Sequence, residues 1–187
     1  MVRCTLFSCV LVQSRDPSYG LVVKSSSAQR CKCANLSVVG VRFEEVLVNG
    51  LATSGGPLIL EACLFKQVAI KGNIGRMAFW GPNVSMPRQE AESLTHAALA
   101  YYEDVDWALD ISEAKFESIE LPWVPGSLVR YDPETQACVN RERARAVLDD
   151  SLPPDVRFPL EKVVESPFET VIIAAPKHGR YFKNVME

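Results

Sequence analysis

The sequence predicts a mainly β fold, an irregular right-handed β-solenoid decorated with two or three α-helices, in a single domain over residues 1–187. Three observations lead to this prediction. A short apolar pattern recurs after phenylalanine, glycines follow it at a fixed distance, and two segments have helical periodicity. An α+β fold with a mixed twisted sheet is the alternative, because the same apolar pattern also occurs in the strands of an ordinary sheet.

The apolar pattern indicates corners in the chain. Five of the eight phenylalanines have Val, Ile or Leu at both the third and the fifth following position, namely Phe7, Phe43, Phe65, Phe116 and Phe168. Along a straight strand, positions 0 and +3 would face opposite sides. Polar residues such as Glu44 and Glu45 separate the two apolar pairs. We therefore expect a bend there, with a second bend at Gly50 and Gly72, where glycine allows a positive φ.

Counted from each phenylalanine, the residues expected to face inward lie at positions −2, 0, +3 and +5. This pattern resembles that of pentapeptide-repeat proteins. Their quadrilateral coils place a small residue and a Leu or Phe inside every five residues. Ala34-Asn35-Leu36 matches the commonest triplet of that family, and Ala114-Lys115-Phe116 nearly does. The likeness covers about a third of the chain. The corners stand 36, 22, 51 and 52 residues apart, so the resemblance implies a solenoid with excursions between its coils.

Helical excursions are expected at about 85–102 and 141–149. In the first, Ala91, Leu94, Ala98 and Tyr101 form an apolar face, and Ser85 is the expected N-cap. In the second, Asn140 is the expected cap, and the side chains expected to face inward are Ala144, Val147 and Leu148. The prolines at 153 and 154 should end this helix. A strand is expected over 168–175 and a terminal helix over 180–187, where no stop signal follows, as in a truncated chain.

Composition excludes several classes of protein. The net charge is −3, which does not suit a phosphate-binding surface for nucleic acid, and no apolar run reaches the length of a membrane span. The apolar stretch before Cys9 is too short for an export signal, so we expect a strand there and a cytoplasmic protein. The six cysteines are expected to be reduced core residues rather than disulfides or a zinc site. No cofactor or metal is expected.

The candidate site residues are acidic and aromatic. Asp104, Asp106, Trp107 and Asp110 lie in one acidic run, and Trp123 lies in a loop between two prolines. Exposed aromatics flanked by carboxylates are typical of protein interfaces, so we expect a partner-binding patch here. A solvated strand face, for the carboxylates, and a packed turn, for Trp123, are the alternatives.

Other residues point less clearly to chemistry. Lys177 and Arg180 are candidates for binding an anion after the last strand. His96 is expected to be a surface or packing residue. A nucleophile pair of Cys138 with His178 has no local support in the sequence, and no catalytic residue is assigned.

The sequence therefore favours a non-enzymatic bacterial protein that binds a protein partner through its surface. Residues 121–163 are similar to the C-terminal parts of some toxin-immunity proteins, with a Pro-Trp loop, a short helix at 143–148 and a Phe158-Pro159 segment in that order. This similarity implies an inhibitor or immunity-type protein. Two alternatives remain: a carboxylate-dependent hydrolase with a cleft near Asp104–Asp110, and an oligomeric structural subunit that forms a homodimer through the solenoid ends.

Overall fold

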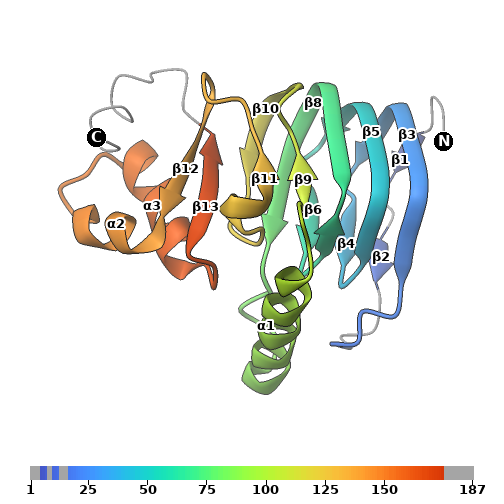
Figure 1. Ribbon diagram of the computed structural model, residues 1–187. Helices are drawn as coiled ribbons and strands as arrows, with labels where there is room; N and C mark the ends of the chain where they lie inside the picture. The colour runs from blue at the N-terminus through green and yellow to red at the C-terminus, as the bar shows by residue number, and fades with distance from the viewer. Residues whose placement is uncertain (1–4, 8–9, 13–16, 175–187) are drawn as a thin grey trace.

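The computed structural model describes residues 5–7, 10–12 and 17–174 of the chain. The fold is mainly β with a mixed sheet, which confirms the prediction at that level (Figure 1). The strands are β1 (Thr5–Phe7), β2 (Val10–Val12), β3 (Val22–Ala34), β4 (Ser37–Val39), β5 (Arg42–Ser54), β6 (Leu58–Glu61), β7 (Leu64–Lys66), β8 (Val68–Trp80), β9 (Leu109–Asp110), β10 (Ala114–Glu120), β11 (Val129–Arg130), β12 (Gln136–Asn140) and β13 (Thr170–Ala174). The helices are α1 (Arg88–Glu103), α2 (Arg141–Val147) and α3 (Pro154–Glu165), with a short 3-10 turn η1 (Gly126–Leu128).

Successive passes of the chain lie side by side and parallel. Val22 of β3 pairs with Arg42 of β5, twenty residues later, and β8 pairs with β5 at an offset of 22 residues. The offset rises to 41 between Val68 of β8 and Leu109 of β9, because α1 is inserted there. Figure 1 shows β1, β3, β5, β8 and β10 in one row, with β2, β4 and β6 in a second row.

Left-handed backbone recurs at every fifth residue in this part of the chain. The residues with positive φ from 25 to 55 are Ser25, Arg30, Asn35, Gly40, Glu45, Gly50 and Gly55, and a second run is formed by Ala62, Gln67 and Gly72. Each such residue bends the chain between two stretches of extended backbone. The long strands β3 and β5 are therefore bent at two internal positions. The predicted second bends at Gly50 and Gly72 are confirmed, with φ of 78° and 73°.

The apolar side chains follow the same period of five. Pairs of residues two positions apart belong to the main apolar cluster or pack against it, and they are Cys31 and Cys33, Leu36 and Val38, Val41 and Phe43, and Val46 and Val48. The period of five runs without a break through these four pairs. The expectation of isolated corners separated by 22 or more residues is therefore wrong for this stretch.

The phenylalanines do not all occupy one column. Phe43 and Phe65 face each other in register, their rings stack at 5.7 Å, and left-handed Glu45 and Gln67 follow them, as predicted. Phe116 instead pairs with Ile74 of β8. Phe168 precedes the antiparallel β13 and packs on Trp123, with ring centroids 6.0 Å apart. Phe7 has no described side chain. The four others share the main apolar cluster, but only two mark equivalent corners.

Helix α1 confirms the first predicted excursion and packs on the main apolar cluster through one face. Leu94, Ala98 and Tyr102 are its buried residues. Ser85 is not the N-cap as expected, because the helix starts three residues later, after Pro87. The N–H of Ser85 donates instead to the Asn83 side chain, in a turn that precedes the helix.

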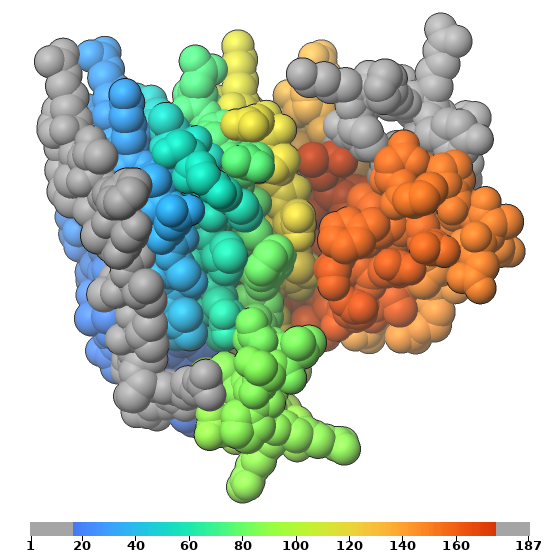
Figure 2. All heavy atoms as spheres, turned by 180° about the vertical axis from the view of Figure 1, so that it is seen from behind, coloured from blue at the N-terminus to red at the C-terminus, as the bar shows by residue number. Residues whose placement is uncertain are grey.

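The C-terminal unit comprises β12, β13, α2 and α3 and has its own small apolar cluster. Figure 2 shows it at one end of the row of strands, in orange and red, while α1 projects beyond the strands in green. Asn140 caps α2 as predicted, and Ala144 is buried. Val147 was expected to face inward but is 42% exposed, because it ends α2 at the wall of a small open cavity that Ala144 also lines.

Helix α3 was not predicted. The two prolines at 153 and 154 were interpreted as a stop after α2, but Pro154 also starts α3. A proline suits the first turn of a helix, because the N–H it lacks has no partner there. The strand expected over 168–175 is β13, and the helix expected over 180–187 lies outside the described residues.

Cys31, Cys33 and Cys63 are buried and free, as expected of core residues. Cys4 and Cys9 lie outside the described residues. In place of the one strand expected near the N-terminus, the structure has two short strands, β1 and β2. Among the described residues, no helix has the length and apolar character needed to cross a membrane. No described strand pairs with the outer edge of β1, and end-to-end dimerisation stays a prediction.

Candidate functional site

A groove of about 610 Å³ opens between the end of β8, helix α1 and the C-terminal unit. Three parts of the chain contribute most of its lining. They are the end of β8 with the following loop (Trp80–Val84), the Pro-Trp loop (Pro122 and Trp123), and α3 with the residues after it (Phe158, Lys162 and Glu165–Pro167). Segments about 40 residues apart thus meet in one concave surface, as ligand and partner sites commonly do.

Two aromatic side chains in the groove are exposed. Trp80 is 37% exposed at the end of β8, and Phe158 is 49% exposed on α3. Trp123 also lines the groove but is only 4% exposed. It lies against the backbone of Gly81, where a Cβ atom would come within 2.7 Å of its ring. Gly81 therefore leaves the space that the buried indole of Trp123 fills, and Trp80 and Phe158 present accessible apolar surface.

Four charged side chains surround this apolar surface. The Trp80 indole N–H donates to Glu120 Oε2 at 2.8 Å, and the Asn83 backbone N–H donates to Glu61 Oε1 at 3.1 Å. Lys162 pairs with Glu165 at 2.7 Å, and its ammonium also lies 5.5 Å from the centre of the Phe158 ring. The groove thus contains three carboxylates and one ammonium.

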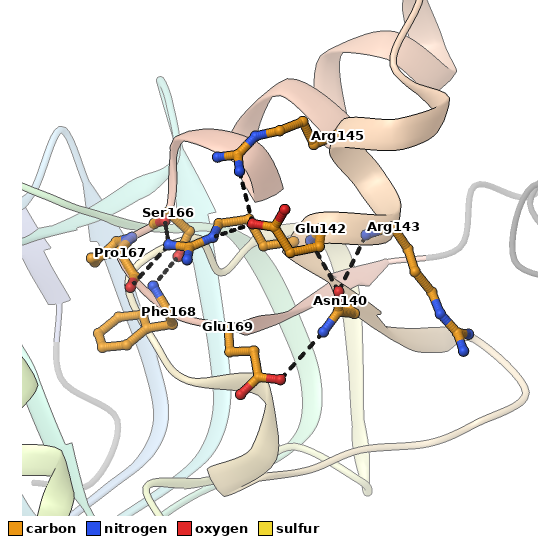
Figure 3. Close-up of polar contacts among 9 residues, drawn as sticks. Asn140, Glu142, Arg143, Arg145, Ser166, Pro167, Phe168 and Glu169 are labelled. Carbon is orange, nitrogen blue, oxygen red and sulfur yellow. Dashed lines mark hydrogen bonds and ion pairs between the residues drawn. The ribbon is translucent and has the colours of Figure 1, made fainter.

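A hydrogen bond joins the C-terminal unit to the Pro-Trp loop, and further bonds hold the C-terminal unit together beside it. The Ser166 hydroxyl donates to the carbonyl oxygen of Pro122 at 2.7 Å and accepts from the Phe168 N–H at 3.2 Å. Arg141 donates from Nη1 to the carbonyl oxygens of Ser166 and Pro167, at 3.2 and 3.3 Å. Figure 3 shows the contacts around Ser166, Pro167 and Phe168, with the Arg143 side chain pointing away from them. The bond from Ser166 to Pro122 joins two walls of the groove, and Arg141 holds α2 against the residues after α3 that form one of these walls.

The predicted acidic run lies elsewhere. Asp104 and Asp106 are exposed after the end of α1, and Asp110 is half-buried and accepts hydrogen bonds from the N–H and hydroxyl of Ser112. Trp107 is half-buried under the Arg130 guanidinium, 4.4 Å from its ring centre. Arg130 also lies 3.9 Å from Asp110. The run therefore faces solvent on its acidic side, and Trp107 is already covered by a side chain of the same molecule.

The remaining residues singled out in the sequence also do not form the predicted site. Trp123 was expected as an exposed anchor but is buried in the groove, because Gly81 and Phe168 pack on it. The packed-turn interpretation describes it better. Lys177, Arg180 and His178 lie outside the described residues. His96 is exposed on α1.

Sequence reasoning missed Trp80, Phe158, Glu61 and Glu120. The sequence contained one signal for Trp80. Phe79 and Trp80 are adjacent at the end of a strand, so their side chains must point to opposite faces of the sheet. Phe79 is fully buried, so Trp80 faces outward. Phe158 was missed because α3 was not predicted.

No described group of three or more His, Cys, Asp or Glu side chains is arranged to hold a metal ion. A second, smaller cavity of about 150 Å³ lies beside α2 and is lined by Cys138, Thr170 and Arg143. Burial raises the pKa of the Cys138 thiol above its usual value. The thiol is therefore protonated near neutral pH and is a weak nucleophile.

Comparison with known proteins leaves the chain without a family assignment. It matches no protein-family model, no curated protein and no solved structure.

Proposed function

We propose that this is a non-enzymatic binding protein that holds a protein partner in the groove, as an inhibitor or immunity-type protein would. The observation that carries the proposal is the exposure of Trp80 and Phe158 in one concave surface about 610 Å³ in volume. Exposed aromatics in pockets supply most of the binding energy in many protein interfaces. Charged residues around them steer association and set the register of the partner.

We also propose that the scaffold beneath the groove is an irregular right-handed β-solenoid of the pentapeptide-repeat kind. The five-residue spacing of left-handed backbone and of inward pairs supports this interpretation, as do the parallel offsets of 20 and 22 residues. A solenoid is rigid because each coil packs on the next. Such a scaffold would hold the groove in a shape suited to binding without a large ordering cost.

A partner-capture experiment tests the proposed function. The purified protein is used as bait in lysate of its source organism, beside the variants Trp80→Ala and Phe158→Ala. Leu99→Ala is the matched control, because Leu99 is a 38% exposed apolar residue on α1 that does not line the groove. The captured partner is then purified and its affinity measured for all four proteins.

The expected result is a partner that binds wild type and Leu99→Ala alike. Its affinity should fall about tenfold or more for each groove variant, since loss of an aromatic anchor costs about 2 kcal/mol. If every captured protein binds all four baits equally, the groove is not the binding site and the proposal is overturned.

A further inference from the structure

The end of β8 lies between two glutamates on neighbouring strands. Glu61 of β6 pairs in register with Trp80, and Glu120 of β10 pairs with Ala78. Ala78 itself pairs with β6 on one edge and with β10 on the other, so the two glutamates flank β8 on opposite sides. Cross-strand neighbours and residues two positions apart share a face of a sheet. Glu61, Trp80 and Glu120 therefore lie on the same face, and all three line the groove.

Neutral donors hold these two carboxylates in place. Glu120 Oε2 accepts from the Trp80 indole N–H at 2.8 Å, which fixes the orientation of the ring. Glu61 Oε1 accepts from the Asn83 backbone N–H at 3.1 Å. The ring of Trp80 remains 37% exposed. An aromatic face of this kind attracts a cation through its quadrupole.

Neither glutamate has a cationic partner in the part of the chain that the structure describes. None of the ion pairs among the described residues includes Glu61 or Glu120. Lys162, which carries the one ammonium among the described groove residues, is already paired with Glu165. The groove thus carries two uncompensated negative charges beside the exposed apolar surface of Trp80 and Phe158.

Building on the proposed function, we propose that the groove binds a partner segment that carries an arginine next to an apolar side chain. The guanidinium would stack on Trp80 and donate hydrogen bonds to the carboxylates of Glu61 and Glu120, while the apolar neighbour would cover Phe158. Arginine suits this site better than lysine, because its planar fork both stacks on an aromatic ring and pairs with carboxylates. The occupant is expected to be cationic, because the groove carries a net negative charge.

A peptide titration tests the inference. The probes are acetyl-Ala-Leu-Arg-Leu-Ala-amide and the same peptide with citrulline, a neutral isostere, in place of arginine. Binding is followed by the indole N–H resonance of Trp80 in the full-length ¹⁵N-labelled protein, assigned by its loss in Trp80→Phe. The arginine peptide should shift this resonance saturably and bind about tenfold more tightly than the citrulline peptide.

Charge-neutral variants link this preference to the two carboxylates. The double variant Glu61→Gln with Glu120→Gln should bind both peptides equally, whereas Glu113→Gln should keep the tenfold preference, because Glu113 pairs with Lys71 away from the groove. An equal affinity of both peptides for wild type, a preference that survives in the double variant, or no saturable shift below about 10 mM peptide would overturn the inference.

The same variants separate this inference from the proposed function. If a partner fails to bind Trp80→Ala but binds the double glutamine variant as tightly as wild type, the proposed function stands and the inference about arginine is overturned. If a partner binds both Trp80→Ala and Phe158→Ala as tightly as wild type, the proposed function is overturned. The peptide titration still decides whether the groove selects arginine.

Discussion

Gly75 on β8 shows how closely neighbouring passes of the chain approach each other. A Cβ atom at this position would overlap the Thr53 hydroxyl and lie 2.6 Å from the Thr53 backbone nitrogen. That hydroxyl is itself occupied, since it accepts from the Arg76 N–H at 2.8 Å. The backbone nitrogen belongs to a paired strand and has no room to move. The lack of a side chain at Gly75 is therefore a packing requirement, distinct from the left-handed backbone at Gly50.

Gly75→Ala should lower the free energy of unfolding by about 3 kcal/mol, because the overlap forces adjacent strands apart. Gly56→Ala is the matched control, since a Cβ there meets nothing within 4 Å, and it should change stability by less than about 0.5 kcal/mol. Urea unfolding measures both. Equal stability of the two variants would show that β5 and β8 are not packed as described.

Burial of thiols and phenols makes the fold sensitive to alkali. Burial raises the pKa of Cys63 from 9.0 to about 12. It also raises the pKa of Tyr101 from 10.0 to about 12, with the Glu44 carboxylate adding to the effect. Above pH 9 the unfolded chain loses these protons while the folded chain keeps them. The folded state thus has its full stability below pH 9 and loses it as the pH rises toward 12.

Urea unfolding between pH 7 and 11 should show a constant free energy up to about pH 9, followed by a decrease of about 1 kcal/mol per pH unit. Cys63→Ala should be less stable at every pH, but with a shallower decrease above pH 9. An unfolding free energy that stays constant up to pH 11 would contradict the burial of these groups.

At the scale of elements, the link between α2 and the end of α3 depends on Arg141. Its Nη1 donates to two carbonyl oxygens that follow the last turn of α3, and its backbone N–H donates to the Glu169 carbonyl at 2.8 Å. Carbonyls at a helix end have no partner within the helix, so a cationic donor there stabilises them. The adjacent Arg143 points away from this group (Figure 3).

Arg141→Met should therefore reduce the free energy of unfolding by about 2 kcal/mol, because two charge-assisted hydrogen bonds are lost and two carbonyls lose their partner. Arg143→Met should leave stability within about 0.5 kcal/mol of wild type. Thermal unfolding of the two variants compares them directly. A similar loss in both would mean that charge, and not the position of the guanidinium, explains the effect.

The elements also show how far the sequence could predict the fold. Corners at Phe43 and Phe65, the bends at Gly50 and Gly72 and the cap of α2 at Asn140 follow from local rules about alternation, glycine and capping. The five-residue repeat from Cys31 to Val48 was equally present in the sequence. It was missed because Cys, Leu, Val and Phe alternate as the inward residues, so a search centred on phenylalanine finds only part of it.

The candidate site could not be predicted in the same way. Its residues come from β6, β8, β10 and α3, and nothing local in the sequence indicates that these segments meet. The acidic run at 104–110 attracted the prediction because its residues are adjacent in sequence. In the fold, its aromatic residue Trp107 is already covered by Arg130.

The whole molecule consists of a long β body and a C-terminal unit. A second apolar cluster lies within the C-terminal unit, while Phe168 and Ile172 of that unit belong to the main cluster. Among the described residues, only the pair Glu120 and Ile173 joins β10 to β13 in register. Since the groove lies between the two parts, its shape depends on how firmly they stay together. Few backbone bonds cross this boundary, so the C-terminal unit should open at lower cost than the body.

Hydrogen exchange should detect this difference. Amides of β12 and β13 are expected to exchange at least about tenfold faster than those of β5 and β8 in the absence of denaturant, since a tenfold change corresponds to about 1.4 kcal/mol. Arg141→Met should increase exchange in the C-terminal unit and leave β5 unchanged. Uniform exchange across both parts would mean that the molecule opens as one cooperative body.

The in-register offset of twenty residues between β3 and β5 has an evolutionary consequence. Duplication of one such pass would add a rung to the body and lengthen it by about 4.8 Å, the spacing between neighbouring strands. Neither the C-terminal unit nor the groove would have to change, because both are built from later passes. Related chains could thus differ in length by whole passes while keeping the same groove.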